Sequence, residues 1–379
     1  MYGETPLWWA AVNGHEEVVR MLLGRSDVRL QCADQNARTP LSWAAGRGHE
    51  GVVRVLLERN DVDPDTADQD ARTPLSWAAE DGHEGVVRAL LERNDVDPDT
   101  ADRDARTPLS WAARNGHEGA VRVLLERKDV DLDTADQDAR TPLSWAAGNG
   151  HEGVVRVLLE QNDVNPDTAD QDARTPLAWA ARNGHEGVVS VLLEQKDVDP
   201  DAADRDARTP LSWAARNGCE GVVRILLGRD EADPNTADKR GRTPLWWAAR
   251  YRRKRIMGIL LERSDVNPNI CDEDGRSPFS LALQFGYDEI VEILLKRNNR
   301  YPETADRTEL PPLAWDMAHR NVRIWRLVLK REVIRYFLVT RYRQEVTENT
   351  SGGFVAGTDF LPYIFRTPVS GHFLPVTST

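Results

Sequence analysis

The sequence predicts an all-α protein built as a solenoid of stacked antiparallel helix pairs with projecting turns. A Thr-Pro-Leu motif recurs every 34 residues, each copy carries two short amphipathic segments, and a stretch rich in Asp, Asn and Pro joins one copy to the next. The threonines of the motif are Thr5, Thr39, Thr73, Thr107, Thr141, Thr175, Thr209 and Thr243, and Ser277 takes the ninth place. This period indicates a repeat architecture in place of the two or three globular domains that 379 residues otherwise suggest.

The first helix of a unit is predicted from its capping residues. In the unit from Gln69 to Asp102, Thr73 is a favourable N-cap and Pro74 takes the first helical position, where its missing N–H costs no hydrogen bond. Gly82 ends the segment. Its apolar face consists of Leu75, Trp77, Ala78 and Ala79.

The second helix begins at the Gly-His-Glu motif, and its apolar stripe consists of Val86, Val87, Leu90 and Leu91. Both helices are shorter than the length of about 12 residues below which an isolated helix is marginal in water. Each must therefore bury its stripe on its partner and on the next unit. The connection from Asn94 to Asp104 is expected to form a tight turn, or finger, between units.

Ten units of 34 residues account for residues 1–340, with the last two degenerate. Residues 341–379 are expected to be a linker or a disordered tail. An apolar-rich stretch over 324–338 is a candidate capping helix, whereas the first unit has no polar outer face. The sequence is therefore expected to be a fragment of a longer chain.

The motifs Thr-Pro-Leu-Ser-Trp-Ala-Ala, Gly-His-Glu and Val-Val-Arg-x-Leu-Leu resemble the ankyrin repeat. The resemblance covers about nine tenths of the chain and implies an ankyrin-type α-solenoid that binds other proteins. Two features depart from the family pattern. Serine replaces the usual His after Thr-Pro-Leu, and Ala37, Ala71 and Ala105 stand where the finger turn usually has Gly. Because Ala resists positive φ, the finger turn is expected to differ from that of the family.

Composition restricts the location and the class of partner. The 49 basic and 62 acidic residues give a net charge of −13, so no nucleic-acid partner is expected. Three cysteines argue against a disulfide framework, and the sequence shows no apolar run long enough to span a membrane and no signal peptide. A monomer, or part of a larger chain, in the cytoplasm is expected. The run Arg252-Arg253-Lys254-Arg255 suggests nuclear import or a phosphate-binding patch as an alternative to a solvated, degenerate unit.

No enzyme, cofactor or metal site is expected. The histidines recur one unit apart, about 8–10 Å, which is too far for two of them to share a zinc ion, so they are interpreted as structural capping residues. Ser, His and Asp all recur, but identical units provide no unique catalytic triad. The Asp-rich connection starting at Asp61 resembles a calcium loop, but Thr66 and Arg72 replace its required Gly and Glu. Turn formation is the preferred interpretation, with weak calcium binding as the alternative.

The tryptophan of each first helix is assigned to the core, with a stacking platform for nucleic acid as the alternative. On this assignment Trp145→Ala should cost about 3–5 kcal/mol.

Two pairs of positions vary between otherwise nearly identical units: the pair after Ala-Ala and the pair in the finger. The resemblance implies that these positions line the concave contact surface, although exposed residues can also drift freely. The provisional protein-binding residues are Arg47, Gln69, Glu80, Asp81, Arg103, Arg114, Asn115, Asn149, Arg182, Asn183, Arg205, Arg216 and Asn217. The predicted function is a scaffold or recognition module for an unidentified partner protein. The alternative is a sensor array within a larger nucleotide-binding signalling receptor.

Overall fold

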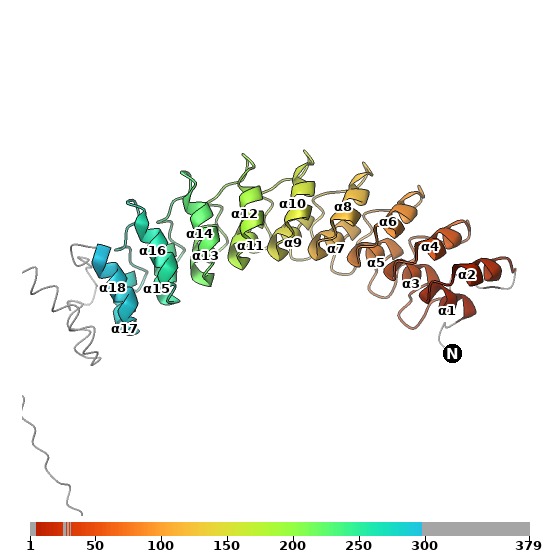
Figure 1. The fold of residues 1–379 in the computed structure, drawn as a ribbon, viewed down its shortest axis with the longest axis horizontal. Helices are drawn as coiled ribbons and strands as arrows, with labels where there is room; N and C mark the ends of the chain where they lie inside the picture. Colours follow the sequence, from red (N-terminus) through yellow and green to blue (C-terminus); the bar gives the residue numbers. More distant parts are fainter. Residues whose placement is uncertain (1–4, 26–27, 29, 31, 298–379) are drawn as a thin grey trace, which may run out of the picture. The chain divides into compact units, whose positions relative to one another are not determined.

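The computed structural model describes residues 5–25, 28, 30 and 32–297. In this part of the chain the regular structure consists of eighteen α-helices, and no strand is present (Figure 1). The first helices of the successive units are α1 (Pro6–Val12), α3 (Pro40–Gly46), α5 (Pro74–Glu80), α7 (Pro108–Asn115), α9 (Pro142–Asn149), α11 (Pro176–Asn183), α13 (Pro210–Asn217), α15 (Pro244–Arg250) and α17 (Pro278–Gln284). The second helices are α2 (Glu16–Leu23), α4 (Glu50–Leu57), α6 (Glu84–Leu91), α8 (Glu118–Leu125), α10 (Glu152–Leu159), α12 (Glu186–Leu192), α14 (Glu220–Leu227), α16 (Lys254–Glu262) and α18 (Asp288–Arg297).

The predicted first helix forms with the predicted caps. In α5 the Ser76 backbone N–H donates to Thr73 Oγ1 at 3.2 Å, and Pro74 is the first helical residue. The Ser76 hydroxyl, at the place of the family's His, lies 3.1 Å from the same threonine oxygen. In α7 the helix ends at Gly116, whose φ of 78° is the left-handed conformation that glycine adopts without a Cβ clash. Short sequence signals therefore determine both ends of these helices.

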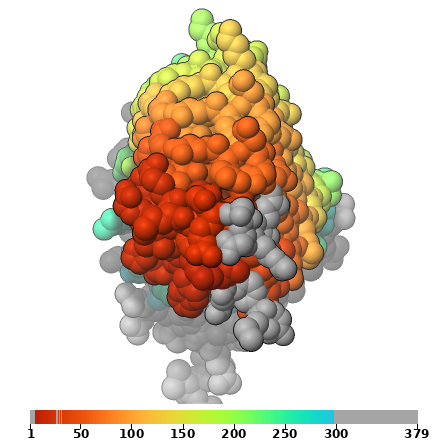
Figure 2. Space-filling view, turned by 90° about the vertical axis from the view of Figure 1, so that its right-hand side faces the viewer, coloured from red at the N-terminus to blue at the C-terminus, as the bar shows by residue number. Residues whose placement is uncertain are grey.

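Neighbouring units bury each other, as the short helices require. The odd-numbered helices contact one another along the inner side of a curved row, and the even-numbered helices do so along the outer side (Figure 1). Leu75, Ala78, Val87 and Leu90 are fully buried in these contacts. Seen from the end that carries the first helix pair, the units that follow are visible above and behind it (Figure 2). A link of a few residues between the two helices of a unit is typical of an antiparallel pair, so the fold is the α-solenoid expected from the repeat.

The expectation of a different finger turn is wrong. Ala37, Ala71, Ala105, Ala139, Ala173 and Ala207 adopt φ between 59° and 62°, while Gly241 and Gly275 have φ of 74° and 76° at the same place in their units. The Ala71 N–H donates to Asp68 O three residues earlier, as the Gly241 N–H donates to Asp238 O. Tertiary packing thus imposes the left-handed turn on alanine, at about 1–2 kcal/mol per residue.

The predictions for residues 298–340, for the capping stretch over 324–338 and for the tail over 341–379 lie outside the described residues. They remain predictions, as does the boundary at residue 340.

Candidate binding face

The odd-numbered helices from α3 to α13 carry a row of tryptophans whose indole N–H groups are hydrogen-bonded, whereas the indole N–H of Trp247 in α15 is buried without a partner among the described residues. Each indole donates to the carboxylate nine residues earlier, at 2.9–3.0 Å, in the pairs Trp43–Asp34, Trp77–Asp68, Trp111–Asp102, Trp145–Asp136, Trp179–Asp170 and Trp213–Asp204. The same aspartates accept backbone N–H groups of the finger, for example those of Asp70 and Arg72 on Asp68. Each of these six tryptophans therefore joins a first helix to its own finger.

The core assignment of the tryptophans is only partly correct. Trp111, Trp213 and Trp247 are buried, but Trp145 is only half-buried and Trp9 is 52% exposed. Trp43, Trp77 and Trp179 are half-buried like Trp145. The indole combines a large apolar ring with a polar N–H group, so it can lie partly exposed on this face and still contact other groups, which the small neighbouring alanines cannot do.

Arginines stack on the tryptophans and make a second row. The Arg72 guanidinium carbon lies 3.9 Å from the ring centre of Trp77 and 4.2 Å from that of Trp111 in the next unit. Arg38, Arg106, Arg140, Arg174 and Arg208 repeat this arrangement, each over the tryptophan of its own unit and that of the next, at 3.7–5.7 Å. We call these tryptophans and arginines the Trp/Arg row.

Sequence reasoning missed the arginines of the Trp/Arg row. Their signal in the sequence is the Arg that precedes Thr-Pro in seven units, from Arg38 to Arg242, whereas the first unit has Glu4 at this place. Cation–π contacts are worth about 0.5–1 kcal/mol at exposed sites and more where water is excluded. The arginines thus help to hold adjacent units together.

Three predicted binding residues extend the Trp/Arg row. The Arg114 guanidinium lies 5.2 Å from the Trp111 ring centre and 4.8 Å from that of Trp145. Arg182 and Arg216 each contact two tryptophans in the same way, at 4.9–5.2 Å. All three side chains are half-buried. Partial burial lowers the pKa of Arg182, and the positive charges of Arg174, Arg216 and Arg140 lower it further.

The predicted asparagines are exposed but connect units. Their Nδ2 atoms donate to a carbonyl at the end of the preceding first helix, at 2.6–2.8 Å, in the pairs Asn115–Glu80, Asn149–Arg114, Asn183–Gly148 and Asn217–Arg182. The structure therefore gives these side chains a structural role, whatever else they contact.

The remaining predicted residues lie at the first-helix ends and in the fingers. Glu80 forms an ion pair with Arg72 at 2.5 Å. Asp81 and Arg47 are exposed at the ends of α5 and α3, and the Arg47 guanidinium lies 5.6 Å from the Trp43 ring centre. Gln69 is exposed, and its side-chain amide donates to Gln35 O of the preceding finger at 2.7 Å. Arg103 and Arg205 are exposed, and the Arg103 backbone N–H donates to Asp70 O at 3.0 Å. Neighbouring fingers are thus linked through backbone and side-chain hydrogen bonds.

The histidines have a structural role, although they do not cap their own helices. His117 stands at the N-cap of α8 without a side-chain capping bond. Its ring nitrogen instead donates to Glu80 O in the preceding unit at 2.8 Å, and His49, His83, His151 and His185 make the same bond at 2.9–3.1 Å. Among the residues that the structure describes, no three His, Cys, Asp or Glu side chains gather as a metal site requires.

The acidic connections are used for turns. Asp97 Oδ1 accepts the Asp99 N–H at 3.0 Å, and Asp99 Oδ2 accepts the Asp131 N–H of the next unit at 2.9 Å. Burial raises the pKa of Asp99, and the same cause raises the pKa of the carboxyls at Asp65, Asp133, Asp167 and Asp201. These contacts favour the turn-forming interpretation over calcium binding.

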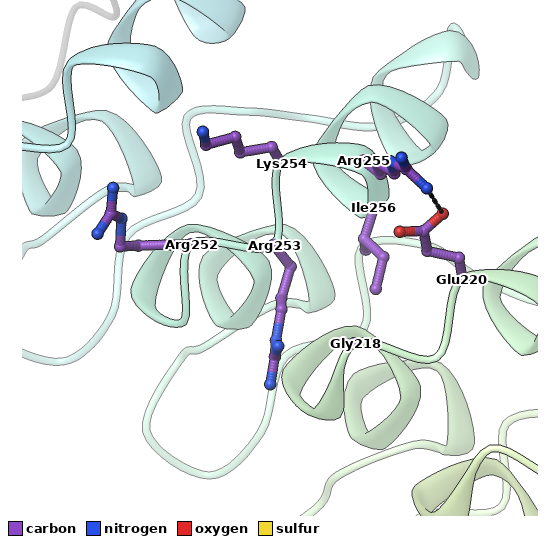
Figure 3. A pocket seen from close by; sticks show the side chains of 7 residues that line it. All are labelled: Gly218, Glu220, Arg252, Arg253, Lys254, Arg255 and Ile256. Atoms are coloured by element: carbon purple, nitrogen blue, oxygen red, sulfur yellow. Dashed lines mark ion pairs between the residues drawn. The ribbon is translucent and has the colours of Figure 1, made fainter.

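The basic run at residues 252–255 does not converge on one point. It lines a cavity of about 260 Å³ beside Glu220, but its side chains point in different directions (Figure 3). Arg252 stacks on Tyr287, Arg253 donates to Arg216 O at 3.1 Å, and Lys254 pairs with Glu289. Arg255 lies 3.6 Å from Glu220. This arrangement does not support a phosphate-binding patch, and a role in nuclear import remains a prediction.

The repeated helix pairs and the single row of stacked aromatic and cationic groups define a repeat protein with an extended face. The family model for ankyrin repeats (3 copies) matches residues 7–102, 94–170, 162–238 and 230–306, so the chain belongs to the ankyrin-repeat family. No curated protein matches the chain. Ankyrin repeats are generally protein–protein interaction modules and form a non-catalytic fold. Within the described residues, none of the helices combines the length and apolar character needed to cross a membrane.

Proposed function

We propose that this chain recognises a partner protein through the inner side of the solenoid, by the Trp/Arg row, the ends of the first helices and the fingers. The observation that carries the proposal is the position of the residues that differ between units. The buried scaffold is nearly identical from unit to unit, whereas Arg114, Gly148 and Arg182 take the same place beside successive tryptophans. Variation is therefore concentrated beside one continuous row of side chains.

The chemistry of this row suits protein recognition. Tryptophan and arginine are enriched among the residues that contribute most to binding energy at protein interfaces. Here hydrogen bonds from the aspartates and contacts with neighbouring rings hold them in place, which reduces the entropy lost on binding. We infer that the array acts by binding, without chemistry of its own.

The proposal is tested by affinity capture from the lysate of the organism that encodes the protein. We expect the array to capture a protein that the triple variant Arg114→Glu/Arg182→Glu/Arg216→Glu does not capture. The matched control is Arg88→Glu/Arg122→Glu/Arg156→Glu, which changes the same charge on the exposed face of the second helices. Circular dichroism establishes that each variant is folded. Equal capture by the two variants, or loss by the control alone, would contradict the assignment of the face.

A further inference from the structure

The charge beside the Trp/Arg row changes sign along the chain. The first residue of the variable pair is neutral or acidic in the early units and mostly arginine later. In chain order these residues are Gly46, Glu80, Arg114, Gly148, Arg182, Arg216 and Arg250. Glu80 forms an ion pair with Arg72. At the place of Glu80 the later units have Gly148, Arg182, Arg216 and Arg250, none of which provides a carboxylate. From α7 to α15 the row is therefore a cationic stretch on a chain whose net charge is −13.

Several of these cations form no ion pair with any residue that the structure describes. Within residues 32–297, Arg114, Arg140, Arg182 and Arg216 form no ion pair, whereas Arg174 and Arg208 pair with Asp172 and Asp206. The indole rings hold the unpaired guanidinium groups at fixed positions. Partial burial and the positive charges of Arg174, Arg216 and Arg140 disfavour the charged form of Arg182, so a bound anion would stabilise it. The cluster is thus a charge arrangement that an external partner can complete.

The carboxyl-terminal end of the stretch is aromatic and open. Tyr251 and Phe285 are each 41% exposed. Tyr251 stacks on Trp247, and the Arg250 guanidinium lies 4.5 Å from the Phe285 ring centre. An apolar side chain of a ligand can contact these rings where the cationic stretch ends.

We propose that the cationic stretch, defined by Arg114, Arg140, Arg182, Arg216 and Arg250 with their tryptophans, binds an extended acidic segment of the partner protein. This inference rests on the proposed function and adds the chemical class of the partner. Neighbouring units lie about 8–10 Å apart, and an extended chain advances about 3.3 Å per residue. Carboxylates at about every third residue would therefore meet successive units, and an apolar residue following them would reach Tyr251 and Phe285.

The structure favours a protein segment over a nucleic acid. Sequence-tolerant binding of single strands uses aromatic faces on which bases stack. Each tryptophan from Trp77 to Trp213 already has at least two guanidinium groups over its ring. The guanidinium groups at the edge of the row remain available to carboxylates, which they can bind in a bidentate geometry.

The test uses the full chain and fluorescent 15-residue peptides. The acidic peptide has Glu at every third position, Ser and Thr between them and a C-terminal Leu, and the matched peptide has Gln in place of Glu. We expect the acidic peptide alone to bind in fluorescence anisotropy at 50 mM NaCl, with binding lost at 500 mM because salt screens exposed charges. Arg182→Gln/Arg216→Gln removes two ion pairs with the peptide. Each exposed ion pair contributes up to about fivefold to the affinity, so the double variant should weaken binding about tenfold. The control Arg122→Gln/Arg156→Gln should leave binding unchanged.

Gly148→Arg provides a gain-of-function arm that misfolding cannot imitate. Gly148 interrupts the cationic stretch between Arg114 and Arg182, and a Cβ added there meets Trp179 Cβ at an ordinary 3.6 Å. The new arginine should tighten binding of the acidic peptide by about threefold to fivefold. A uridine oligonucleotide of the same charge serves as the competing ligand.

Three results would overturn the inference: no binding of the acidic peptide, equal binding of the Gln peptide, or tighter binding of the oligonucleotide. An unchanged affinity of Gly148→Arg would also count against it. Capture of a protein from lysate that depends on Arg114, Arg182 and Arg216 would still support the proposed function in those cases. Loss of that dependence would refute the proposed function itself.

Discussion

The finger alanines provide a stability test in which the chain supplies its own control. Ala105 holds φ at 61°, where an L-residue with a Cβ costs about 1–2 kcal/mol, whereas Gly241 holds φ at 74° at the equivalent place. Ala105→Gly removes this cost but adds about 0.5–1 kcal/mol of backbone entropy lost on folding. The difference predicts a gain of about 0.5–1 kcal/mol in the free energy of unfolding.

The reciprocal variant Gly241→Ala should lose more than Ala105→Gly gains. A Cβ at Gly241 would lie 2.9 Å from Cys271 O and 3.1 Å from Asp272 Cα, both backbone atoms that cannot move aside cheaply. We therefore expect a loss of about 1–2 kcal/mol or more. The assay is urea unfolding at 25 °C followed by circular dichroism, with each variant compared with the unmodified chain. A loss of stability in Ala105→Gly would refute the interpretation that the finger alanines are strained.

Three further predictions concern single contacts between or within units. Asp99→Asn should be more stable than the unmodified chain at pH 7, because burial raises the pKa of Asp99. The ionised Asp99 carboxylate therefore lowers the free energy of unfolding at pH values above its folded pKa. This cost disappears as the pH falls towards the unfolded pKa of 3.8. Asn235, at the equivalent place, already accepts the Asn267 N–H and donates to Asp265 O, so an amide fits this turn. Thermal melts at different pH values should show the advantage of Asp99→Asn at pH 7 and its loss as the pH falls towards 3.8; an advantage that grew in acid would contradict this sign. Cys219→His should raise the free energy of unfolding by about 1 kcal/mol, because Cys219 Sγ lies 3.9 Å from Arg182 O, whereas in five other units a histidine donates to the equivalent carbonyl. A lower melting temperature would contradict the stabilising role of the histidine bond. Trp145→Phe keeps a ring for Arg114 and Arg140 but leaves Asp136 without its indole donor, so chemical unfolding should show a loss of about 1–3 kcal/mol, and no loss would show that the N–H bond is dispensable.

The sequence was sufficient to predict the fold because the relevant signals are local and repeated. Thr73 and Pro74 start a helix through bonds within one turn, and the stripe of Val87 and Leu90 requires a neighbour wherever it occurs. The repeat then specifies that neighbour, because every unit presents nearly the same surface. The conformation of Ala105 could not be predicted in this way, since the finger's tertiary contacts override the intrinsic preference of alanine.

The candidate site was less accessible to sequence reasoning. Variation between units identified Arg114 and Arg182, but it could not identify Arg72 or Arg140, which do not vary. Their function depends on stacking between tryptophans 34 residues apart, and that contact becomes visible only when the units are stacked. The asparagines show the converse problem, because Asn115 varies in sequence and is exposed but bonds to the preceding unit.

The basic run shows that clustering in sequence does not ensure clustering in space. Arg252 and Lys254 take their partners from the following unit, while Arg253 and Arg255 take theirs from the preceding one. Alternate residues at the start of α16 thus face different neighbours (Figure 3). A consecutive run of charges in a solenoid is divided among units, whereas charges one repeat apart come together on one face.

The most direct measurement is the ratio of the dissociation constants of the acidic peptide for the unmodified chain and for Gly148→Arg, determined side by side at 50 mM NaCl. The account predicts a ratio of about three to five, because the new arginine fills the gap between Arg114 and Arg182. A ratio of one, with both proteins folded, would contradict a continuous cationic stretch that reads carboxylates unit by unit.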